Sequence, residues 1–123
     1  MKTHGIILFG HGARDPRWAE PFERLVVKLR GLRGGPVLLA FLELMSPDLP
    51  AAVAQLAADG CDAITVVPVF FGQGGHVRKD LPEIVEKCRA AHPDVVISCA
   101  TAVGEDDAVL DAVAQYCLRQ VGR

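Results

Sequence analysis

Short apolar runs alternate with amphipathic stretches along the chain. Each run consists largely of apolar residues, mainly Val, Ile, Leu and Phe, which is typical of strands buried on both faces of a sheet. The four runs are residues 6–9, 37–42, 64–67 and 95–100. After each run, apolar residues recur at spacings of three and four, the pattern of a helix with one apolar face. The four helical stretches are residues 18–32, 49–56, 84–88 and 109–117.

Polar residues and prolines indicate where these helices begin. Asp15 and Ser46 each precede a proline, a combination favoured at helix starts because the side chain caps free backbone N–H groups. Asp80 is followed three positions later by a glutamate, which matches a capping box. We therefore expect the third helix to begin at Asp80 and residues 70–79 to form a long loop.

The order of the elements predicts the fold class. Strands that alternate with helices through short connections form a parallel sheet with helices on both faces, because crossover connections are nearly always right-handed. The commonest arrangement of four such strands is the order 2-1-3-4 of a flavodoxin-like half. No linker or low-complexity segment divides the chain, so we expect residues 1–123 to form a single α/β domain. Its ligands should bind beyond the carboxyl ends of the strands.

Composition narrows the classes of function. Half of the residues are hydrophobic (50%), 23% are charged and the formal net charge is -2, ordinary values for a globular protein and not for a disordered, membrane or nucleic-acid-binding one. The four cysteines include no C-x-x-C pair, which argues against a zinc knuckle, and we expect reduced, packed thiols. No apolar run approaches the ~20 residues of a membrane span. We therefore expect a cytoplasmic protein that binds neither membrane nor nucleic acid.

Three residues with metal-binding or proton-transfer chemistry follow predicted strands. His11 comes directly after the first strand, Glu43 after the second, and His76 in the segment after the third. Under the order 2-1-3-4 these strand ends share one crevice. Two imidazoles and a carboxylate that meet there would suit a divalent metal ion. A lone histidine in a loop is more often without function, so the interpretation depends on the strand order.

Residues near the two histidines indicate a flat, anionic ligand. Gly74 and Gly75 match no phosphate-binding motif, but backbone without side-chain bulk can lie along a planar ligand. Phe70 offers apolar surface beside them, unless it is an ordinary core residue. Arg14 and Arg78, with two more basic residues nearby, form a predicted basic rim that could bind carboxylates, although exposed helix starts carry such residues without function.

The same segments resemble the small form of the sirohydrochlorin chelatases, the CbiX-type cobaltochelatases of the class II chelatase family. The resemblance covers nearly the whole chain. It is carried by residues 8–15 (LFGHGARD), 40–43 (AFLE), 47–50 (PDLP), 67–71 (VPVFF) and 75–82 (GHVRKDLP). Members of the family often have serine at the position of Ala13, a change that removes a hydroxyl near the site but no expected ligand.

The resemblance implies a chelatase-like fold and an enzyme, a lyase that inserts a divalent metal into sirohydrochlorin or a related tetrapyrrole with release of two pyrrole protons. Co²⁺ is the expected ion, with Ni²⁺ or Fe²⁺ as alternatives, and it is a substrate rather than a prosthetic group. His11 and His76 match the family's metal-binding histidines, and Glu43 matches its acidic residue. The resemblance also implies a homodimer and a role in cobalamin or porphyrin biosynthesis.

Three other kinds of protein share some of these sequence features. A histidine phosphotransfer mutase also places a His-Gly pair after its first strand, but it needs arginine before that histidine, and here the residue is Gly10. A carrier of metal or tetrapyrrole would use the same pocket without turnover, and residue types cannot separate it from a chelatase. A plain interaction domain would lose only stability when His11 or His76 is replaced by alanine.

Overall fold

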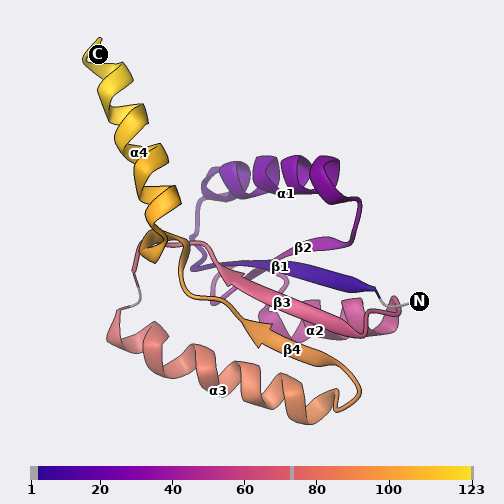
Figure 1. The fold of residues 1–123 in the computed structure, drawn as a ribbon. Helices are drawn as coiled ribbons and strands as arrows, with labels where there is room; N and C mark the ends of the chain where they lie inside the picture. The colour runs from indigo at the N-terminus through magenta and orange to yellow at the C-terminus, as the bar shows by residue number, and fades with distance from the viewer. Residues whose placement is uncertain (1–2, 73, 123) are drawn as a thin grey trace.

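Four parallel strands form a single sheet in the order β2-β1-β3-β4, which confirms the predicted fold class and strand order (Figure 1). The computed structural model describes residues 3–72 and 74–122, with the side chains of residues 75 and 76 outside the described part. In the register, Ile7 of the central strand β1 lies between Leu38 of β2 and Val66 of β3. The strands are β1 (His4–Gly10), β2 (Val37–Phe41), β3 (Ala63–Pro68) and β4 (Val96–Cys99).

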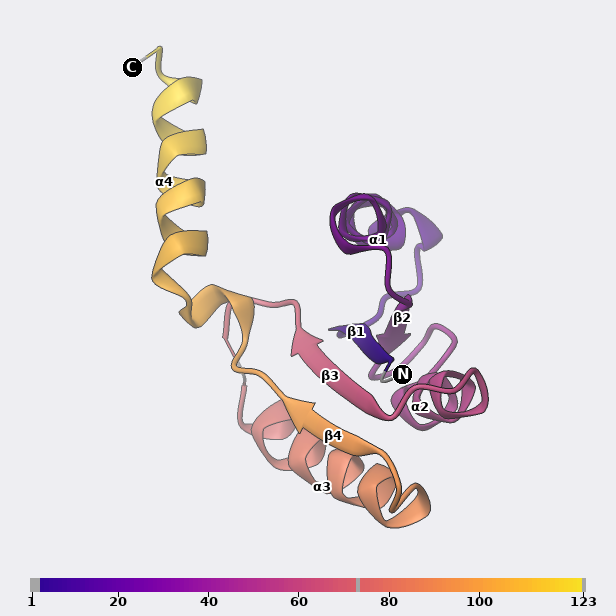
Figure 2. The same cartoon turned by 45° about the vertical axis from the view of Figure 1, so that its right-hand side comes forward.

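The helices are distributed unequally over the two faces of the sheet. Two helices, α2 and α3, cover one face, which we call the closed face, and α1 alone lies over the other, which we call the open face (Figures 1 and 2). The last helix, α4, projects away from the sheet. The helical elements are η1 (Pro16–Ala19), α1 (Glu20–Arg33), α2 (Leu49–Ala58), α3 (Gly75–Ala91), η2 (Val103–Glu105) and α4 (Asp107–Gln120).

The main hydrophobic core lies on the closed face. Side chains alternate along a strand, so Ile7 and Phe9 of β1 enter this core, whereas Leu8 points to the open face. Leu56 of α2 and Leu81 of α3 pack against the same side of the sheet and are almost fully buried. On the open face, by contrast, a small cluster of three buried residues is bordered by six hydrophobic side chains that are only partly buried.

The third helix begins earlier than the sequence pattern predicts. It begins at Gly75, not at Asp80, so the predicted long loop over residues 70–79 is wrong in its second half. The reason is burial: Val77, Leu81 and Val85 recur every four residues and all enter the closed-face core. This apolar stripe extends the helix across Pro82, a residue that lacks the N–H of a helical hydrogen bond.

The predicted helix starts are right at one position and wrong at another. Asp15 caps the short helix η1, where its side chain accepts a hydrogen bond from the backbone N–H of Arg17. Ser46 does not cap α2, because the chain makes a further turn and Asp48 accepts the bond from the Ala51 N–H at 2.9 Å. Within the described ranges, none of the helices combines the length and the apolar character needed to cross a bilayer.

Candidate functional site

The chain brings the segments after β1 and β2 together by continuing their pairing beyond the strand ends. The Leu42 N–H donates to the Gly10 carbonyl at 2.9 Å, and the Glu43 N–H donates to the His11 carbonyl at 3.1 Å. The backbones of His11 and Glu43 are therefore held side by side at the carboxyl end of the sheet, where parallel α/β folds bind their ligands.

Gly12 allows the two segments to approach this closely. Its φ of 101° lies in the left-handed region that favours glycine, and a Cβ built on it would lie 1.8 Å from the carbonyl oxygen of Glu43. A side chain at this position would push Glu43 away from the His11 segment. The glycine after His11 thus has a defined structural role.

The side chains of His11 and Glu43 meet outside the sheet. His11 Nε2 lies 3.6 Å from Glu43 Oε1, and the two side chains are 50% and 49% exposed. A neutral imidazole nitrogen and a carboxylate oxygen both bind borderline divalent ions and both accept protons. Because half of each side chain faces solvent, a ligand approaching from outside can reach both groups at once.

A tight turn follows Glu43. Leu44 has a positive φ of 67°, and the Met45 N–H donates to the Glu43 carbonyl at 2.8 Å, which gives a turn of the γ type. A non-glycine residue in this region is strained, and such strain is frequently found at functional sites. The turn directs the chain back toward α2 immediately after Glu43. Glu43 therefore lies at the outermost point of the loop between β2 and α2.

An aromatic cluster supports the strand ends on the open face. The rings of Trp18 and Phe22 lie 4.7 Å apart between centroids, and both contact Phe41, the last residue of β2, at 6.2 and 6.5 Å. A Cβ at Gly10 would meet the Phe22 and Trp18 rings at 3.2 to 3.3 Å. The cluster thus packs directly against Gly10, the residue before His11, and holds the end of β1 in place.

His76 lies in the first turn of α3, after the carboxyl end of β3, and its imidazole is outside the described side chains. Gly74 is the N-cap of that helix, and its carbonyl accepts a hydrogen bond from the Arg78 N–H at 2.9 Å. Gly75 is the first helical residue. Among the side chains that the structure describes, no three His, Cys, Asp or Glu residues form a metal-binding group. The predicted triad is therefore represented by the His11 and Glu43 pair, with His76 untested.

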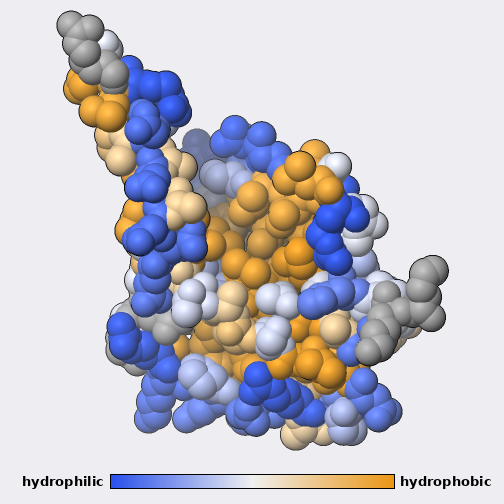
Figure 3. Space-filling view, in the orientation of Figure 1, coloured by the Kyte–Doolittle hydropathy of each residue, from blue (hydrophilic) through white to orange (hydrophobic). Residues whose placement is uncertain are grey.

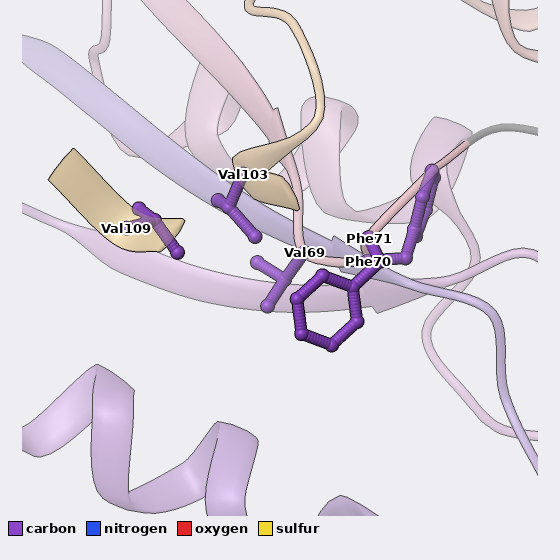
Figure 4. Close-up of a pocket in the computed structure, with 5 residues that line it drawn as sticks. All are labelled: Val69, Phe70, Phe71, Val103 and Val109. Carbon is purple, nitrogen blue, oxygen red and sulfur yellow. The ribbon is translucent and has the colours of Figure 1, made fainter. Parts of the chain in front are cut away.

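Phe70 and the residue after it lie beside the site in different environments. Phe70 is half-buried with its ring edge-on to Phe9 at 6.4 Å, whereas Phe71 is 66% exposed. Both border a small apolar recess of about 220 Å³ between the end of β3 and the start of α4 (Figure 4). Its lining residues are Val69, Phe70, Phe71, Val103 and Val109.

The η2 segment beside this recess has a role that the amino-acid pattern does not predict. The Gly104 N–H donates to the Phe70 carbonyl at 3.1 Å, and a Cβ at Gly104 would lie 2.1 Å from the Phe71 Cα. The segment before α4 is therefore fastened to the loop that follows β3. A single glycine in a polar stretch gives no sequence signal for such a contact.

The basic rim is smaller than the sequence suggests. Arg14 and Arg78 are both exposed near the ends of β1 and β3. Arg17 is bound to Asp15 through two nitrogens, with the shorter distance 2.8 Å. That hydrogen bonding lowers the pKa of the Asp15 carboxyl and raises the pKa of the Arg17 guanidinium, so both remain charged. The Arg17 guanidinium is thus held by Asp15 at the start of η1.

Comparison with known proteins relates this arrangement to one family. The CbiX family model matches residues 5–119. The sirohydrochlorin cobaltochelatase of Methanosarcina acetivorans is 32% identical over 117 residues, which cover 89% of this chain and 90% of that protein. That of Saccharolobus solfataricus is 31% identical, with 85% of this chain and 86% of that protein covered. The match to the Methanothermobacter thermautotrophicus enzyme, 36% identical, spans 66% of this chain but only 57% of that protein.

Solved structures share the fold. The cobalamin (vitamin B12) biosynthesis CbiX protein of Marinobacter aquaeolei is 33% identical with a TM-score of 0.86, and 98% of each chain is covered. The sirohydrochlorin chelatase SirB of Bacillus subtilis subspecies spizizenii, solved in complex with cobalt, is 25% identical with a TM-score of 0.78. There 92% of this chain matches 49% of the SirB chain, so this chain spans about half the length of SirB. With its sheet order, its strand-end histidine and this match over most of its length, the chain belongs to the CbiX family.

Proposed function

We propose that this protein is a sirohydrochlorin chelatase, a lyase that inserts a divalent metal ion, Co²⁺ first of all, into the tetrapyrrole. The observation that carries the proposal is the pair of His11 and Glu43, whose side chains meet 3.6 Å apart at the carboxyl end of the sheet. Membership of the CbiX family supports it, as do the sirohydrochlorin cobaltochelatases among the relatives. One SirB structure holds cobalt and another Fe³⁺, which supports iron as an alternative ion. Ni²⁺ is a further alternative because imidazole and carboxylate ligands also bind it.

The proposed reaction exchanges one divalent ion for two protons. The ion loses water ligands, the two pyrrole N–H groups of the ring lose their protons, and four ring nitrogens bind the ion. A neutral imidazole at His11 can hold the ion by a ring nitrogen while the carboxylate of Glu43 accepts a proton that leaves the ring. His76, at the start of α3, would supply the second imidazole. Holding ion and ring together makes the encounter intramolecular, which can contribute up to ~7–11 kcal/mol.

The same geometry supports a large flat substrate. The recess beside Phe70 is about 220 Å³, below the ~300–1,000 Å³ of typical small-molecule pockets, so a tetrapyrrole would lie over the strand ends and not inside one chain. Backbone without side-chain bulk at Gly74 and Gly75 would face the ring, and the guanidinium groups of Arg14 and Arg78 would bind its carboxylates.

A second copy of the chain would cover the substrate from its other side. The length of SirB supports this part of the proposal, because a chain twice as long has room for two such units. We therefore propose a homodimer of 123-residue single-domain chains.

The proposal includes a cytoplasmic location and no prosthetic group. All four cysteines are free thiols, two of them exposed, which suits a reducing compartment. The metal enters as a substrate.

Anaerobic insertion of Co²⁺ into sirohydrochlorin, followed by the absorbance change of the ring, tests the proposal. We expect wild-type protein to accelerate insertion above the metal-only rate with many turnovers per chain. His11→Ala and His76→Ala should each reduce the rate by about 100-fold, as expected for loss of a group that transfers protons or holds the ion. His92→Ala is the matched control, because His92 lies at the far end of α3, and it should keep the wild-type rate.

The assay also separates a chelatase from a carrier. Binding of Co²⁺ or sirohydrochlorin that is lost in His11→Ala, without any rate above the metal-only control with Co²⁺, Ni²⁺ or Fe²⁺, would overturn the enzymatic proposal and favour a carrier. Unchanged binding and unchanged rates in both histidine variants would exclude the site altogether.

A further inference from the structure

Helix α4 has no packing partner along most of its length within the described chain. It leaves the body of the molecule at η2 and projects away from the sheet on the side of α1, without lying against α1 (Figures 1 and 2). Every residue from 110 to 122 is exposed, and none of the helix is buried. Only Val109 at its base is half-buried, in the recess beside Phe70 (Figure 4). A helix of 14 residues in isolation is marginal in water, so tertiary packing normally stabilises it.

The exposed helix is nevertheless amphipathic. Its apolar residues recur at spacings of three and four and lie on one side, which we call the α4 stripe. Val113, at the centre of the stripe, is 38% exposed, and Tyr116, one turn further along, is 55% exposed. Asp111 and Gln115 lie on the opposite side. The α4 stripe consists of Val109, Leu110, Val113, Tyr116, Cys117 and Val121.

The open face of the sheet carries apolar residues that no helix of the described chain covers completely. Val67 of β3 and Val69 after it pack against the small open-face cluster but are only partly buried, and Val96 of the edge strand β4 is 72% exposed. Figure 3 shows hydrophobic surface in the hollow between α1 and α4. Thr65 Oγ1 of β3 lies 3.2 Å from Ser98 Oγ of β4, and by the alternation of side chains this polar pair faces the open side of the sheet. The open face therefore has room for one more helix next to α1.

The surface area of the chain matches this view. The accessible surface is 7823 Å², whereas a compact monomer of 13.2 kDa exposes roughly 6,400 Å². The excess of about 1,400 Å² is larger than the ~800 Å² that each partner buries in a standard protein interface. A single chain thus exposes enough additional surface to form a stable dimer.

We propose that two copies exchange α4, so that the α4 stripe of each packs on the open face of the other beside α1. In the described part of each chain, the α4 stripe is exposed beyond Val109, and part of the apolar open face is covered by no helix. A reciprocal exchange would bury both surfaces and would form a closed dimer with two-fold symmetry. The inference gives an interface to the homodimer proposed above and does not depend on which metal or ring is bound.

The charges of α4 favour a second copy over a membrane surface. The polar side carries Asp107 and Asp111, and the only basic residue of the helix is Arg119. An amphipathic helix that lies on an anionic membrane is instead rich in lysine and arginine. The acidic polar side would face water in the dimer.

The exchange would also link the partner to the site. The segment before α4 is fastened to the loop after β3 by the hydrogen bond between Gly104 and Phe70. A partner that binds α4 is therefore close to the segment that is hydrogen-bonded to the loop beside the apolar recess. In this arrangement the partner chain lies next to the surface where the tetrapyrrole is expected.

The molar mass in solution tests the exchange, measured by light scattering on the full chain without metal or tetrapyrrole. We expect the wild type at twice the 13.2 kDa of one chain. Val113→Lys places a charge at the centre of the α4 stripe and should give the monomer mass. Gln115→Lys adds the same charge two residues away on the opposite side, and it should remain a dimer. A monomeric wild type, or a dimeric Val113→Lys, would overturn the proposal.

A substitution on the receiving surface tests where α4 packs. Ser98→Lys on the open face should weaken the dimer, whereas Ala90→Lys, exposed on α3 at the closed face, should not. A dimer unaffected by Ser98→Lys would show that α4 does not occupy this face, and would overturn the proposed exchange.

Thiol labelling gives an independent measure. Cys117 lies in the α4 stripe and is exposed in the single chain, so its alkylation, followed by mass spectrometry, should slow as the protein concentration rises. It should be fast at all concentrations in Val113→Lys. Equal labelling at every concentration in the wild type would contradict the exchange. Because none of these measurements uses substrate, they can fail while the chelatase assay succeeds, and the reverse.

Discussion

On its closed face the sheet is packed by two helices, and on its open face by one. The closed-face core contains 15 buried residues with five partly buried ones around it, whereas the open-face cluster has three buried and six partly buried. The two faces share the same strands, so the difference arises from what covers them. The closed face accounts for the stability of the single chain, and the open face leaves apolar area for association. The candidate site lies at the strand ends where the two faces meet.

The largest effect is expected from a cavity on the closed face. Leu56 of α2 is fully buried in the core, so Leu56→Ala removes its packing and leaves a cavity. We expect a loss of about 3–5 kcal/mol in the free energy of unfolding. Urea denaturation followed by circular dichroism measures it. A loss below ~1 kcal/mol would show that the closed face does not dominate stability.

A smaller effect is expected from the same substitution on the open face. Leu29 of α1 is only partly buried there, so Leu29→Ala should cost about 1–2 kcal/mol in the Val113→Lys background, where α4 is not exchanged. In the wild-type background the cost should be larger, because the partner helix would pack beside α1. Equal costs in the two backgrounds would contradict the idea that a second copy completes the open face.

The smallest effect concerns two thiols of the closed face at alkaline pH. Burial raises the pKa of Cys61 and of Cys88, with nearby aspartates adding to the shift. A raised pKa in the folded state means that the unfolded chain releases the proton first. Stability should therefore be unaffected below the unfolded value of ~8.5 and fall as the pH rises above it, by at most ~1.4 kcal/mol per pH unit for each thiol.

Replacing the two cysteines isolates this contribution. The double variant Cys61→Ala, Cys88→Ala should show a shallower decline of stability between pH 8.5 and 10 than the wild type, in thermal or urea unfolding. An identical decline would mean that other groups cause the alkaline loss, and that the closed face does not hold these thiols in their neutral form.

The sequence was sufficient for the sheet and for the placing of His11 beside Glu43, whereas the roles of the site residues stay predictions. Continuous apolar strands between helices determine a parallel sheet, and the commonest strand order then brings the ends of β1 and β2 together, which the pairing of His11 and Glu43 confirms. The boundary of α3 was not predictable from local signals. The sequence at Asp80 matches a capping box, but Asp80 lies inside α3, because the burial of Val77 on the closed face extends the helix to Gly75.

Long-range packing explains what the sequence could not supply. The apolar spacing of α4 predicts a helix with one apolar side, yet it does not say whether that side packs on its own sheet or elsewhere. Similarly, Gly12 reads as a permissive residue, and only the structure shows that the Glu43 carbonyl occupies the place of its Cβ. For Gly12 the contact is 31 residues away in the sequence, and for α4 we propose that it lies on a second copy of the chain.

The central claim is that His11 and Glu43 act as one chelatase site at this junction. A double-mutant cycle on anaerobic Co²⁺ insertion into sirohydrochlorin, with His11→Ala, Glu43→Gln and both together, tests it most directly. Side chains 3.6 Å apart that serve one step should be strongly non-additive, so the double variant should be about as slow as the slower single one. Losses that multiply in the double variant, or a wild-type rate equal to the metal-only control, would contradict the account.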